Sequence, residues 1–299
     1  MYNFFFDRIL QSIDVVDAPF AFLDGGAKAN YSDLINWSAR YANSLAELGL
    51  QPGDFVVCPL RRDIHQIFLY IATLRAGGIF VPLNEPEKLE QLERLAAVRH
   101  KRIFVCADTR QFHGSDRRRE SASPNNGGAT RYSAGHPFLF ELASRAQSQF
   151  QDAIRVPNDP AVLFLDREPS TFTHRRLANE AARVVTLLRL TSSARLIQAV
   201  PVSDPNGFLL AANVVMLSNG SMYFYEKFAG QSGEEALRAA TYVAGVRGYY
   251  DELVSSHSLN SARRRDIQVL LTDQVAFSLV TEQKFPAITG HSIVSNFGL

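Results

Sequence analysis

Short apolar runs alternate along the chain with longer segments in which apolar residues recur at helical spacing. The short runs predict buried strands, and the helical spacing predicts amphipathic helices between them. In the first half, the pattern predicts helices at 31–48, 64–76 and 87–98 and strands at 55–60, 79–83 and 102–107. In the second half, it predicts strands at 161–165, 195–200, 221–226, 241–246, 266–271 and 291–297, and helices from 174, at 208–217, at 233–240 and at 278–285. Strands that alternate with helices indicate an α/β fold with mostly parallel sheets.

One junction between a strand and a helix raises a question of chemistry. The stretch LFLDREPSTFTHRRLANEAARVV, residues 163–185, begins as a buried strand, crosses a polar loop and continues as an amphipathic helix. The start of a helix has unpaired N–H groups and a partial positive charge, so such a junction is a favoured phosphate site. This loop contains no glycine, and its charged part is Asp166, Arg167 and Glu168 before Pro169. The loop is therefore unusual for a phosphate cradle.

A long polar segment interrupts the periodic pattern. Residues 108–136 are rich in Gly, Ser and Asn and nearly free of aliphatic residues, which predicts a surface excursion. We therefore expect a first α/β subdomain at 1–157, which carries this excursion, and a second at 158–299. The triplet Arg117–Arg119 lies beside Glu120 without interleaved aromatic residues, so a solvated loop is favoured over a nucleic-acid contact.

Composition and charge narrow the classes of partner. The chain has 299 residues, of which 46% are hydrophobic and 20% charged, as in ordinary globular proteins. Its formal net charge of +1 provides no field that would attract nucleic acid or an anionic membrane. No apolar stretch approaches the roughly 18 residues of a membrane span, and Asp7 and Arg8 interrupt the apolar N-terminus. The sequence therefore predicts a cytoplasmic protein without a membrane span or a nucleic-acid partner.

The two cysteines lie in separate apolar runs. Cys58 is in VVCPL and Cys106 is in IFVCAD, without a CxxC spacing or a histidine at ligand spacing. This setting favours buried structural thiols, and a disulfide or a metal site is the alternative.

Two ordered motifs resemble those of a known family. The segments YSDLINWSARYANSLAELGLQPGDFVVCPL and IFLYIATLRAGGIFVPLN contain Leu48–Leu50, Pro52–Asp54 and Arg75–Gly78 in this order. They resemble the N-terminal subdomain of the adenylate-forming enzymes, the acyl-CoA synthetases in particular, in which one helix ends in LGL.PGD.V and the next in K/RAGG.YVPLN. Further on, PVSDPNGFLLAANVVMLSNGSMYFYEKF and TGHSIVSNFGL are similar to the malonyl-CoA synthetase branch. The resemblance extends from about Phe4 to Leu299.

This resemblance implies a fold and an activity. The fold would be the layered N-terminal domain of the family, with two α/β subdomains of mostly parallel sheets and a smaller β portion. The C-terminal lid domain would be absent, because the chain stops at the family's YGMTE-like motif. The family adenylates a carboxylic acid with Mg-ATP and passes the acyl group to coenzyme A, chemistry that relies on positioning and neutralising phosphates.

The phosphate-binding loop of the family, YTSGTTGRPKG followed by a Thr-His pair, is reduced in this chain. The strand Val162–Leu165 and the pair Thr173–His174 match the two ends of the motif, but the glycine-rich body and its lysine are missing between them. Ser170 and Thr171 keep hydroxyl groups, whereas the carboxylate of Asp166 would repel a triphosphate.

Three further family motifs are also altered. Asp204 and Asn206 replace both histidines of a His-Thr-His-Gly motif. The family's adenine loop SGSAPL corresponds to Thr272–Phe277, which lacks the glycine that lets the backbone approach a base. Asn296 replaces the arginine that would pair with the distal carboxylate of malonate, and the glutamate that supports Mg²⁺ is absent. The vestigial nucleotide-site positions are Asp166, Ser170, Thr171, Thr173, His174, Asp273, Gln274, Phe297 and Gly298, and the vestigial acyl-site positions are Asp204, Asn206 and Asn296.

Some of these positions have a second interpretation. His174 is either a general base or an exposed histidine at the head of a helix, and the second is favoured. Asp204 is either a metal ligand together with Asp273 or a turn residue, and the turn is favoured. The aromatic residues at 223–225 and 249–250 either line an acyl pocket or pack in the core and its rim, and packing is favoured.

The losses are concentrated at the nucleotide site, whereas the apolar pattern and the turn glycines remain. This selectivity indicates a pseudoenzyme related to malonyl-CoA synthetase, with no intact catalytic residue and no metal site. No cofactor is expected, although the family uses ATP, Mg²⁺ and coenzyme A. The predicted role is a binding or regulatory module that docks to an active paralogue or associates with itself. The alternatives are an active small-carboxylate–CoA ligase with a rebuilt site, and a non-functional truncated gene product.

Overall fold

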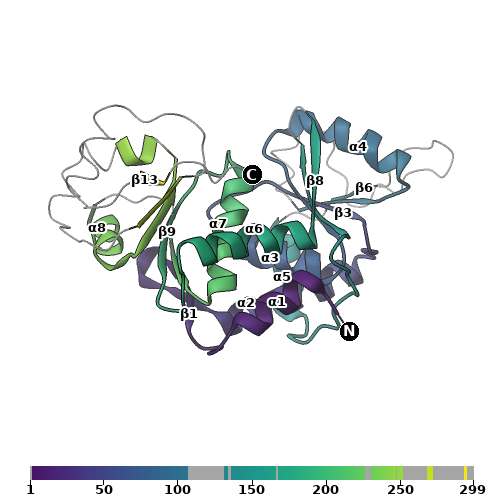
Figure 1. Cartoon of the computed structure of the whole chain (residues 1–299). Coiled ribbons are helices and arrows are strands. Elements are labelled where there is room, and N and C mark those ends of the chain that lie inside the picture. Colours follow the sequence, from purple (N-terminus) through teal and green to yellow (C-terminus); the bar gives the residue numbers. More distant parts are fainter. Residues whose placement is uncertain are drawn as a thin grey trace. The chain divides into compact units, whose positions relative to one another are not determined.

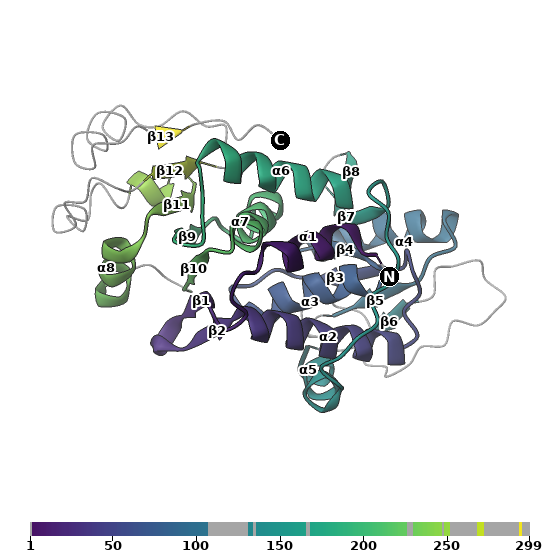
Figure 2. The same cartoon turned by 60° about the horizontal axis from the view of Figure 1, so that its bottom comes forward.

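The computed structural model describes residues 2–106, 131–133, 136–165, 168–225, 230–246, 248–251, 268–271 and 293–294. Contacts within the chain group its residues into two compact units. The first unit consists of residues 1–10 and 32–178, and the second of residues 11–31 and 179–299. Figures 1 and 2 show the helices and strands of both units.

The first unit is built on a sheet whose described strands follow the order β6-β5-β3-β4-β7-β8. Neighbouring strands are parallel except β7 and β8, which form an antiparallel hairpin. The strands are β3 (Phe55–Cys58), β4 (Ile79–Pro82), β5 (Ile103–Val105), β6 (Arg131–Ser133), β7 (Pro160–Leu165) and β8 (Pro169–Thr173). The helices in this part of the chain are α1 (Phe4–Ser12), α2 (Tyr31–Glu47), α3 (Ile64–Arg75), the short 3-10 helix η2 (Pro86–Lys88), α4 (Leu89–Val98) and α5 (His136–Arg145).

Helices cover both faces of this sheet. In Figure 1, α4 lies on one side of the strands, and α2 and α3 lie on the other. Alternate residues of a strand point to opposite faces, so one set packs against α4. That core cluster consists of Phe55, Val57, Ile79, Val81, Leu83, Leu89, Leu92, Ala96, Ile103, Val105, Leu163 and Leu165. The predicted helices and strands of this region are confirmed.

The two turn motifs of the sequence contact one another. The N–H of Gly53 donates to the carbonyl of Gly77 at 2.8 Å, and the N–H of Ile79 donates to the carbonyl of Asp54 at 2.8 Å. The side chain of Asp54 forms an ion pair with Arg102 at 2.9 Å. Gly77 has a φ of 81°, a conformation that favours glycine. These motif residues therefore hold the beginnings of β3 and β4 together.

A buried ion pair joins three helices to the segment before β7. The Nε of Arg75 donates to Oδ1 of Asp152 at 2.6 Å. The Nη1 of Arg75 donates to the carbonyl of Ile35 at 2.8 Å and to Oγ of Ser38 at 2.9 Å. The guanidinium also lies 4.2 Å from the ring centre of Phe6. Burial lowers the pKa of Arg75 and raises the pKa of Asp152, so the pairing offsets a desolvation cost.

The second unit has a sheet whose described strands follow the order β13-β12-β11-β9-β10-β1-β2. Neighbouring strands are parallel except β1 and β2. The strands are β1 (Pro19–Leu23), β2 (Lys28–Asn30), β9 (Arg195–Ala199), β10 (Ser221–Phe224), β11 (Tyr242–Gly245), β12 (Gln268–Leu271) and β13 (Ile293–Val294). The helices are the 3-10 helix η1 (Asp24–Gly26), α6 (His174–Leu187), which begins in the first unit, α7 (Pro205–Ser218) and α8 (Gly230–Ala239). The helix predicted at 278–285 lies outside the described residues.

Two pairings cross the predicted boundary between residues 157 and 158. β7 pairs with β4 through Val162 and Phe80, so the first strand of the predicted second subdomain belongs to the first sheet. β1 pairs with β10 through Ala21 and Met222, so a segment near the N-terminus belongs to the second sheet. The structural units therefore interleave along the sequence, whereas the predicted subdomains are contiguous.

Two segments that were predicted as loops contain strands. Residues 169–173 form β8, because their backbone groups pair with β7. Within the predicted excursion at 108–136, residues 131–133 form β6 beside β5, and His136 begins α5. The rest of that excursion, including the arginine triplet, lies outside the described residues. Pairing with a neighbouring strand of the sheet therefore overrides the polar composition of residues 169–173 and 131–133.

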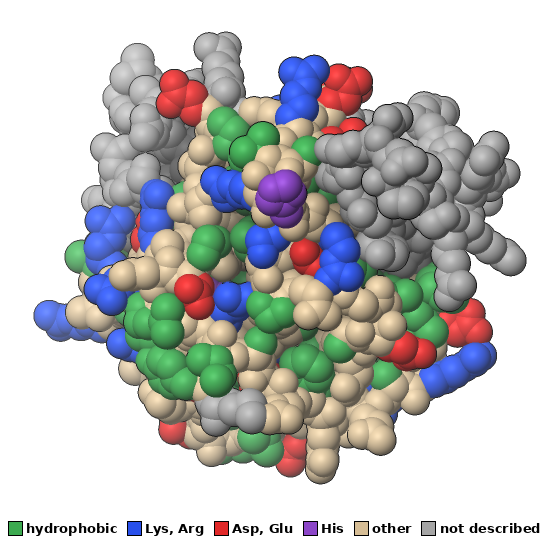
Figure 3. Space-filling model, turned by 90° about the vertical axis from the view of Figure 1, so that its right-hand side faces the viewer, with side chains coloured by type: hydrophobic (Ala, Val, Ile, Leu, Met, Phe, Trp, Pro, Cys, Tyr) green, Lys and Arg blue, Asp and Glu red, His purple; other side chains and the backbone are tan. Residues whose placement is uncertain are grey.

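Two observations bear on the predicted absence of a membrane span and of a nucleic-acid partner. Within the described part of the chain, no helix is long and apolar enough to span a membrane. On the face shown in Figure 3, basic and acidic side chains are interspersed.

Candidate functional site

The β7–β8 hairpin occupies the position of the predicted phosphate loop. Leu165 is paired with Pro169, and Val162 is paired with Phe172. This register leaves three residues, 166–168, to connect the two strands. Asp166 itself lies outside the described residues, as does Arg167. Residues 169–172, which lie between the matched ends of the loop motif, are therefore paired with β7 as part of a strand.

The N-terminus of α6 is occupied by the protein's own acceptors. The N–H of His174 donates to the carbonyl of Asp159 at 3.1 Å, and the N–H of Arg175 donates to the carbonyl of Pro157 at 2.7 Å. The N–H of Arg176 donates to Oγ1 of Thr173 at 3.2 Å. A helix begins with N–H groups that lack helical partners, and these are the groups that would bind phosphate. In this protein the first three are already paired.

The remaining hairpin residues pack or face solvent. The ring of Phe172 lies 4.9 Å from the ring of Phe164, and the guanidinium of Arg176 lies 3.5 Å from the ring centre of Phe172. Thr171 is exposed and Ser170 is half-buried. The arginine next to the helix start therefore covers an aromatic ring.

His174 is buried, and the prediction of an exposed histidine is wrong. Its side chain is 0% exposed, and neither ring nitrogen has a hydrogen-bond partner among the described residues. Burial lowers the pKa of His174 to about 4; the charge of Arg155 lowers it further, and the charge of Asp159 opposes the change. The segment that carries Arg155 and Asp159 folds back over the start of α6, which local sequence could not show. The imidazole is therefore a neutral core group at pH 7.

Asp204 begins α7 as its N-cap. Its Oδ1 accepts a hydrogen bond from the N–H of Gly207 at 2.9 Å, and Pro205 is the first helical residue. Asn206 is half-buried within the first turn of the same helix. An N-cap carboxylate satisfies an unpaired helical N–H and interacts favourably with the helix dipole. The structure thus gives Asp204 a structural role that requires no metal.

We expect Asp204→Ala to lower the free energy of unfolding by about 1 kcal/mol, because the capping hydrogen bond is lost. Asp204→Asn keeps an acceptor and is expected to cost only a few tenths of that amount. Urea denaturation of the three proteins measures both values. Equal stability of the alanine variant and the parent would contradict the capping role.

The aromatic residues of the predicted acyl pocket pack in the core of the second unit. Tyr250 is buried, and its hydroxyl donates to the carbonyl of Val243 at 3.0 Å. The ring of Tyr249 approaches Gly245 so closely that a Cβ there would lie 3.0 Å from it. The cluster comprises Ile197, Ala199, Tyr223, Ala236, Leu237, Ala240, Val243 and Tyr250, with Phe22, Tyr225, Ala239 and Tyr249 packed against it. This packing supports the core interpretation of these aromatics.

Several predicted site residues have no structural description. Asp166, Asp273, Gln274, Asn296, Phe297 and Gly298 lie outside the described residues. Among the residues that are described, no group of three His, Cys, Asp or Glu side chains could hold a metal ion.

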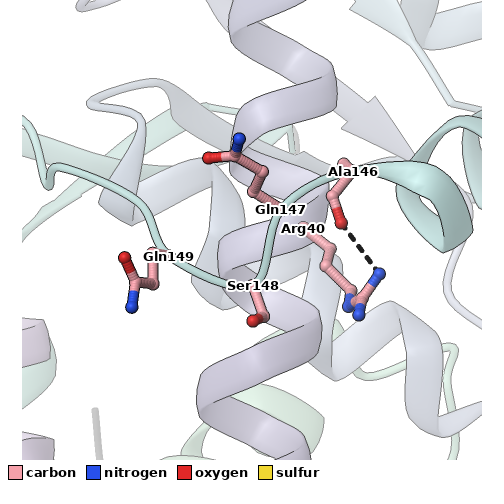
Figure 4. Close-up of a pocket in the computed structure, with 5 residues that line it drawn as sticks. All are labelled: Arg40, Ala146, Gln147, Ser148 and Gln149. Atoms are coloured by element: carbon pink, nitrogen blue, oxygen red, sulfur yellow. Dashed lines mark hydrogen bonds between the residues drawn. The ribbon is translucent and has the colours of Figure 1, made fainter.

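A surface hollow of about 460 Å³ in the first unit has no counterpart among the predicted site residues. It is lined by Arg40 and residues 146–149. Figure 4 shows the guanidinium of Arg40 directed at the carbonyl of Ala146. The Nη1 of Arg40 donates to that carbonyl at 2.8 Å and to the carbonyl of Ser144 at 3.0 Å. The arginine thus anchors the chain after α5 to α2, and no sequence motif indicated this hollow.

Comparison with known proteins identifies the family. The family model described as AMP-binding enzyme matches residues 14–165. The apo structure of MatB from Rhodopseudomonas palustris has a TM-score of 0.82 and 26% identity, with 98% of this chain and 59% of MatB covered. The structure of ATP-bound MatB gives the same TM-score and identity. The nonribosomal peptide synthetase nanA from Aspergillus nanangensis is 33% identical over 82 residues, which cover 27% of this chain and 3% of nanA.

The chain therefore spans 59% of the length of MatB and a small fraction of nanA. The predicted α/β fold and the predicted resemblance to adenylate-forming enzymes of the malonyl-CoA synthetase branch are confirmed by these matches. Since the family match covers half of the sequence and the fold matches over nearly all of it, the chain belongs to the family of AMP-binding enzymes.

Proposed function

We propose that this chain is a pseudoenzyme related to malonyl-CoA synthetase, which binds a partner or regulates one instead of adenylating a carboxylic acid. The observation that carries the proposal is the occupied N-terminus of α6. Three N–H groups that would cradle phosphate donate to Asp159, Pro157 and Thr173. Exposing them to a nucleotide would break three intramolecular hydrogen bonds, each worth about 1 kcal/mol.

The hairpin adds a second argument. A connection of three residues between Leu165 and Pro169 is too short to surround a triphosphate, and it contains no glycine or lysine. Asp166 and Glu168 place two carboxylates in this connection. Like charges disfavour the approach of a phosphate group. An ATP-bound structure of MatB has been solved, and the proposal attributes the difference between that relative and this chain to the loop.

The partner follows from the same proposal. A domain that keeps the shape of its family without the nucleotide loop can present that shape to an active paralogue or to a second copy.

The cellular location that fits the proposal is the cytoplasm, because both cysteines are free and buried, as is usual in a reducing compartment.

Carboxylate-dependent pyrophosphate exchange tests the proposal. We expect no exchange above a protein-free blank with a panel of small carboxylic acids that includes malonate, whereas MatB serves as the positive control. Exchange above the blank would instead support an active ligase with a rebuilt site. Cooperative, reversible unfolding of a monodisperse protein would argue against a non-functional product.

A further inference from the structure

We propose that Cys58 and Cys106 form a two-coordinate site for a soft monovalent cation, of which Cu(I) is the biological example. The site lies in the first unit, away from the hairpin and the start of α6, so it is independent of the proposed function. The pairing of β3 with β5 carries the argument. Val57 is in register with Val105, and the N–H of Cys106 donates to the carbonyl of Val57 at 2.8 Å.

The same ladder, continued by one residue, places the two cysteines opposite each other. Neighbouring strands are about 4.8 Å apart, and residues in register on parallel strands point to the same face. Val57 and Val105 belong to the core on the α4 face, so the two cysteines are on the opposite face, with α2 and α3. The pKa of Tyr41 on α2 is raised mainly by burial and also by the charges of Asp63 and the two cysteines. The register therefore places both cysteines side by side on this face of the sheet.

The position in the sheet is one where α/β proteins commonly bind ligands. β3 is followed through α3 by β4 on one side, whereas β5 lies on its other side. The carboxyl ends of β3 and β5 thus flank a topological switch point, because β3 leads to a strand on one side and β5 leads to a strand on the other. Cys58 is the last residue of β3, and Cys106 directly follows β5.

Two buried thiols side by side favour a particular class of metal ion. Cys58 and Cys106 are 0% and 2% exposed, and the described residues offer no third ligand to form a metal-binding group. Zn²⁺ requires four ligands, whereas Cu(I) and Ag(I) accept two thiolates in a linear arrangement. On binding, each thiol loses its proton and forms one sulfur–metal bond, so two protons are released per cation. Burial raises the pKa of the Cys58 thiol most strongly, and the charges of Cys106 and Asp63 raise it further, so the bound cation must supply the charge that stabilises the thiolates; the nearby charge of Arg61 acts in the same direction as the cation.

Silver(I) is the probe, because it has the same preference for two thiolates as Cu(I) and, unlike Cu(I), is not oxidised by air. Native mass spectrometry of the full chain is expected to show one Ag(I) on the folded protein and none on Cys58→Ala or Cys106→Ala. The chain has two cysteines. The number of Ag(I) ions per protein molecule therefore distinguishes one ion shared by both thiols from one ion on each thiol. Two ions on the parent and one on each variant would overturn the proposal, as would the absence of binding to the folded parent.

Two further measurements do not depend on the variants. X-ray absorption of the Cu(I)-loaded parent is expected to show two sulfur ligands and no nitrogen or oxygen ligand. A thermal scan with Ag(I) is expected to raise the melting temperature, because the site exists only in the folded state. A lowered melting temperature would show that the ion prefers the unfolded chain and would overturn the proposal. An X-ray absorption spectrum with nitrogen or oxygen ligands, or with one sulfur ligand, would also contradict a site shared by the two thiols.

Discussion

Replacing Arg75 by methionine is expected to lower the free energy of unfolding by about 3–5 kcal/mol. The side chains of Arg75 and Asp152 are 5% and 18% exposed, so removal of the cation leaves a largely buried carboxylate without its charged partner. The variant also loses hydrogen bonds to Ile35 and Ser38 and the contact with the ring of Phe6. Urea denaturation of the parent and the variant measures the change.

Arg145→Met is the matched control. Arg145 pairs with Glu141 at 2.6 Å on α5, but the two side chains are 77% and 57% exposed. Exposed pairs contribute about 0–1 kcal/mol, so the control is expected to remain close to the parent. Adding Asp152→Leu to Arg75→Met should restore part of the lost stability, since the uncompensated carboxylate is removed. Similar effects of Arg75→Met and Arg145→Met would contradict the assigned role of the buried pair.

The second large effect concerns acid stability and His174. The pKa of this imidazole is lowered from 6.5 to about 4, mainly by burial. Above pH 6.5 the group is neutral in both the folded and the unfolded chain, so it contributes no pH dependence. Between pH 6.5 and pH 4 the unfolded chain binds a proton that the folded chain does not, and stability falls. The loss levels off below pH 4, at about 3 kcal/mol in total.

His174→Gln removes this titration while keeping a polar side chain. The difference in unfolding free energy between parent and variant is expected to be constant above pH 6.5 and to shift by about 3 kcal/mol in favour of the variant by pH 4. Urea denaturation at a series of pH values gives this difference, and the region above pH 6.5 is its internal control. NMR titration of the ring supplies the folded pKa directly. A pH-independent difference, with a ring pKa near 6.5, would contradict the buried position.

Local pattern was sufficient for much of the first unit. The apolar spacing of α2 and α3, together with the glycine turns that follow them, predicted both helices and the strands after them. The apolar residues that recur at helical spacing in α2 are among its buried residues, and α3 is buried on nearly all of its circumference, so periodicity and burial agree. The family resemblance rested in part on these same turns, whose residues contact one another at the beginnings of β3 and β4.

The candidate site was less predictable, because backbone pairing between segments decides it rather than local composition. The residues of β8 are polar and follow a charged turn, so composition suggested a loop, and pairing with β7 makes them a strand. His174 appeared to be at an exposed helix start, but the chain at 155–159 returns to that start and supplies its acceptors. Asp204 was predicted as a turn residue, and the structure makes it the N-cap of α7, which begins at Pro205 rather than at the predicted residue 208.

Calorimetric titration of the protein with Mg-ATP tests most directly the central claim, which is that this chain does not bind nucleotide. The occupied start of α6 and the short β7–β8 connection predict no saturable heat at millimolar nucleotide, under conditions in which MatB binds. Saturable binding with a Kd below about 1 mM, equivalent to about −4 kcal/mol or better, would contradict the claim that this chain has lost its nucleotide site.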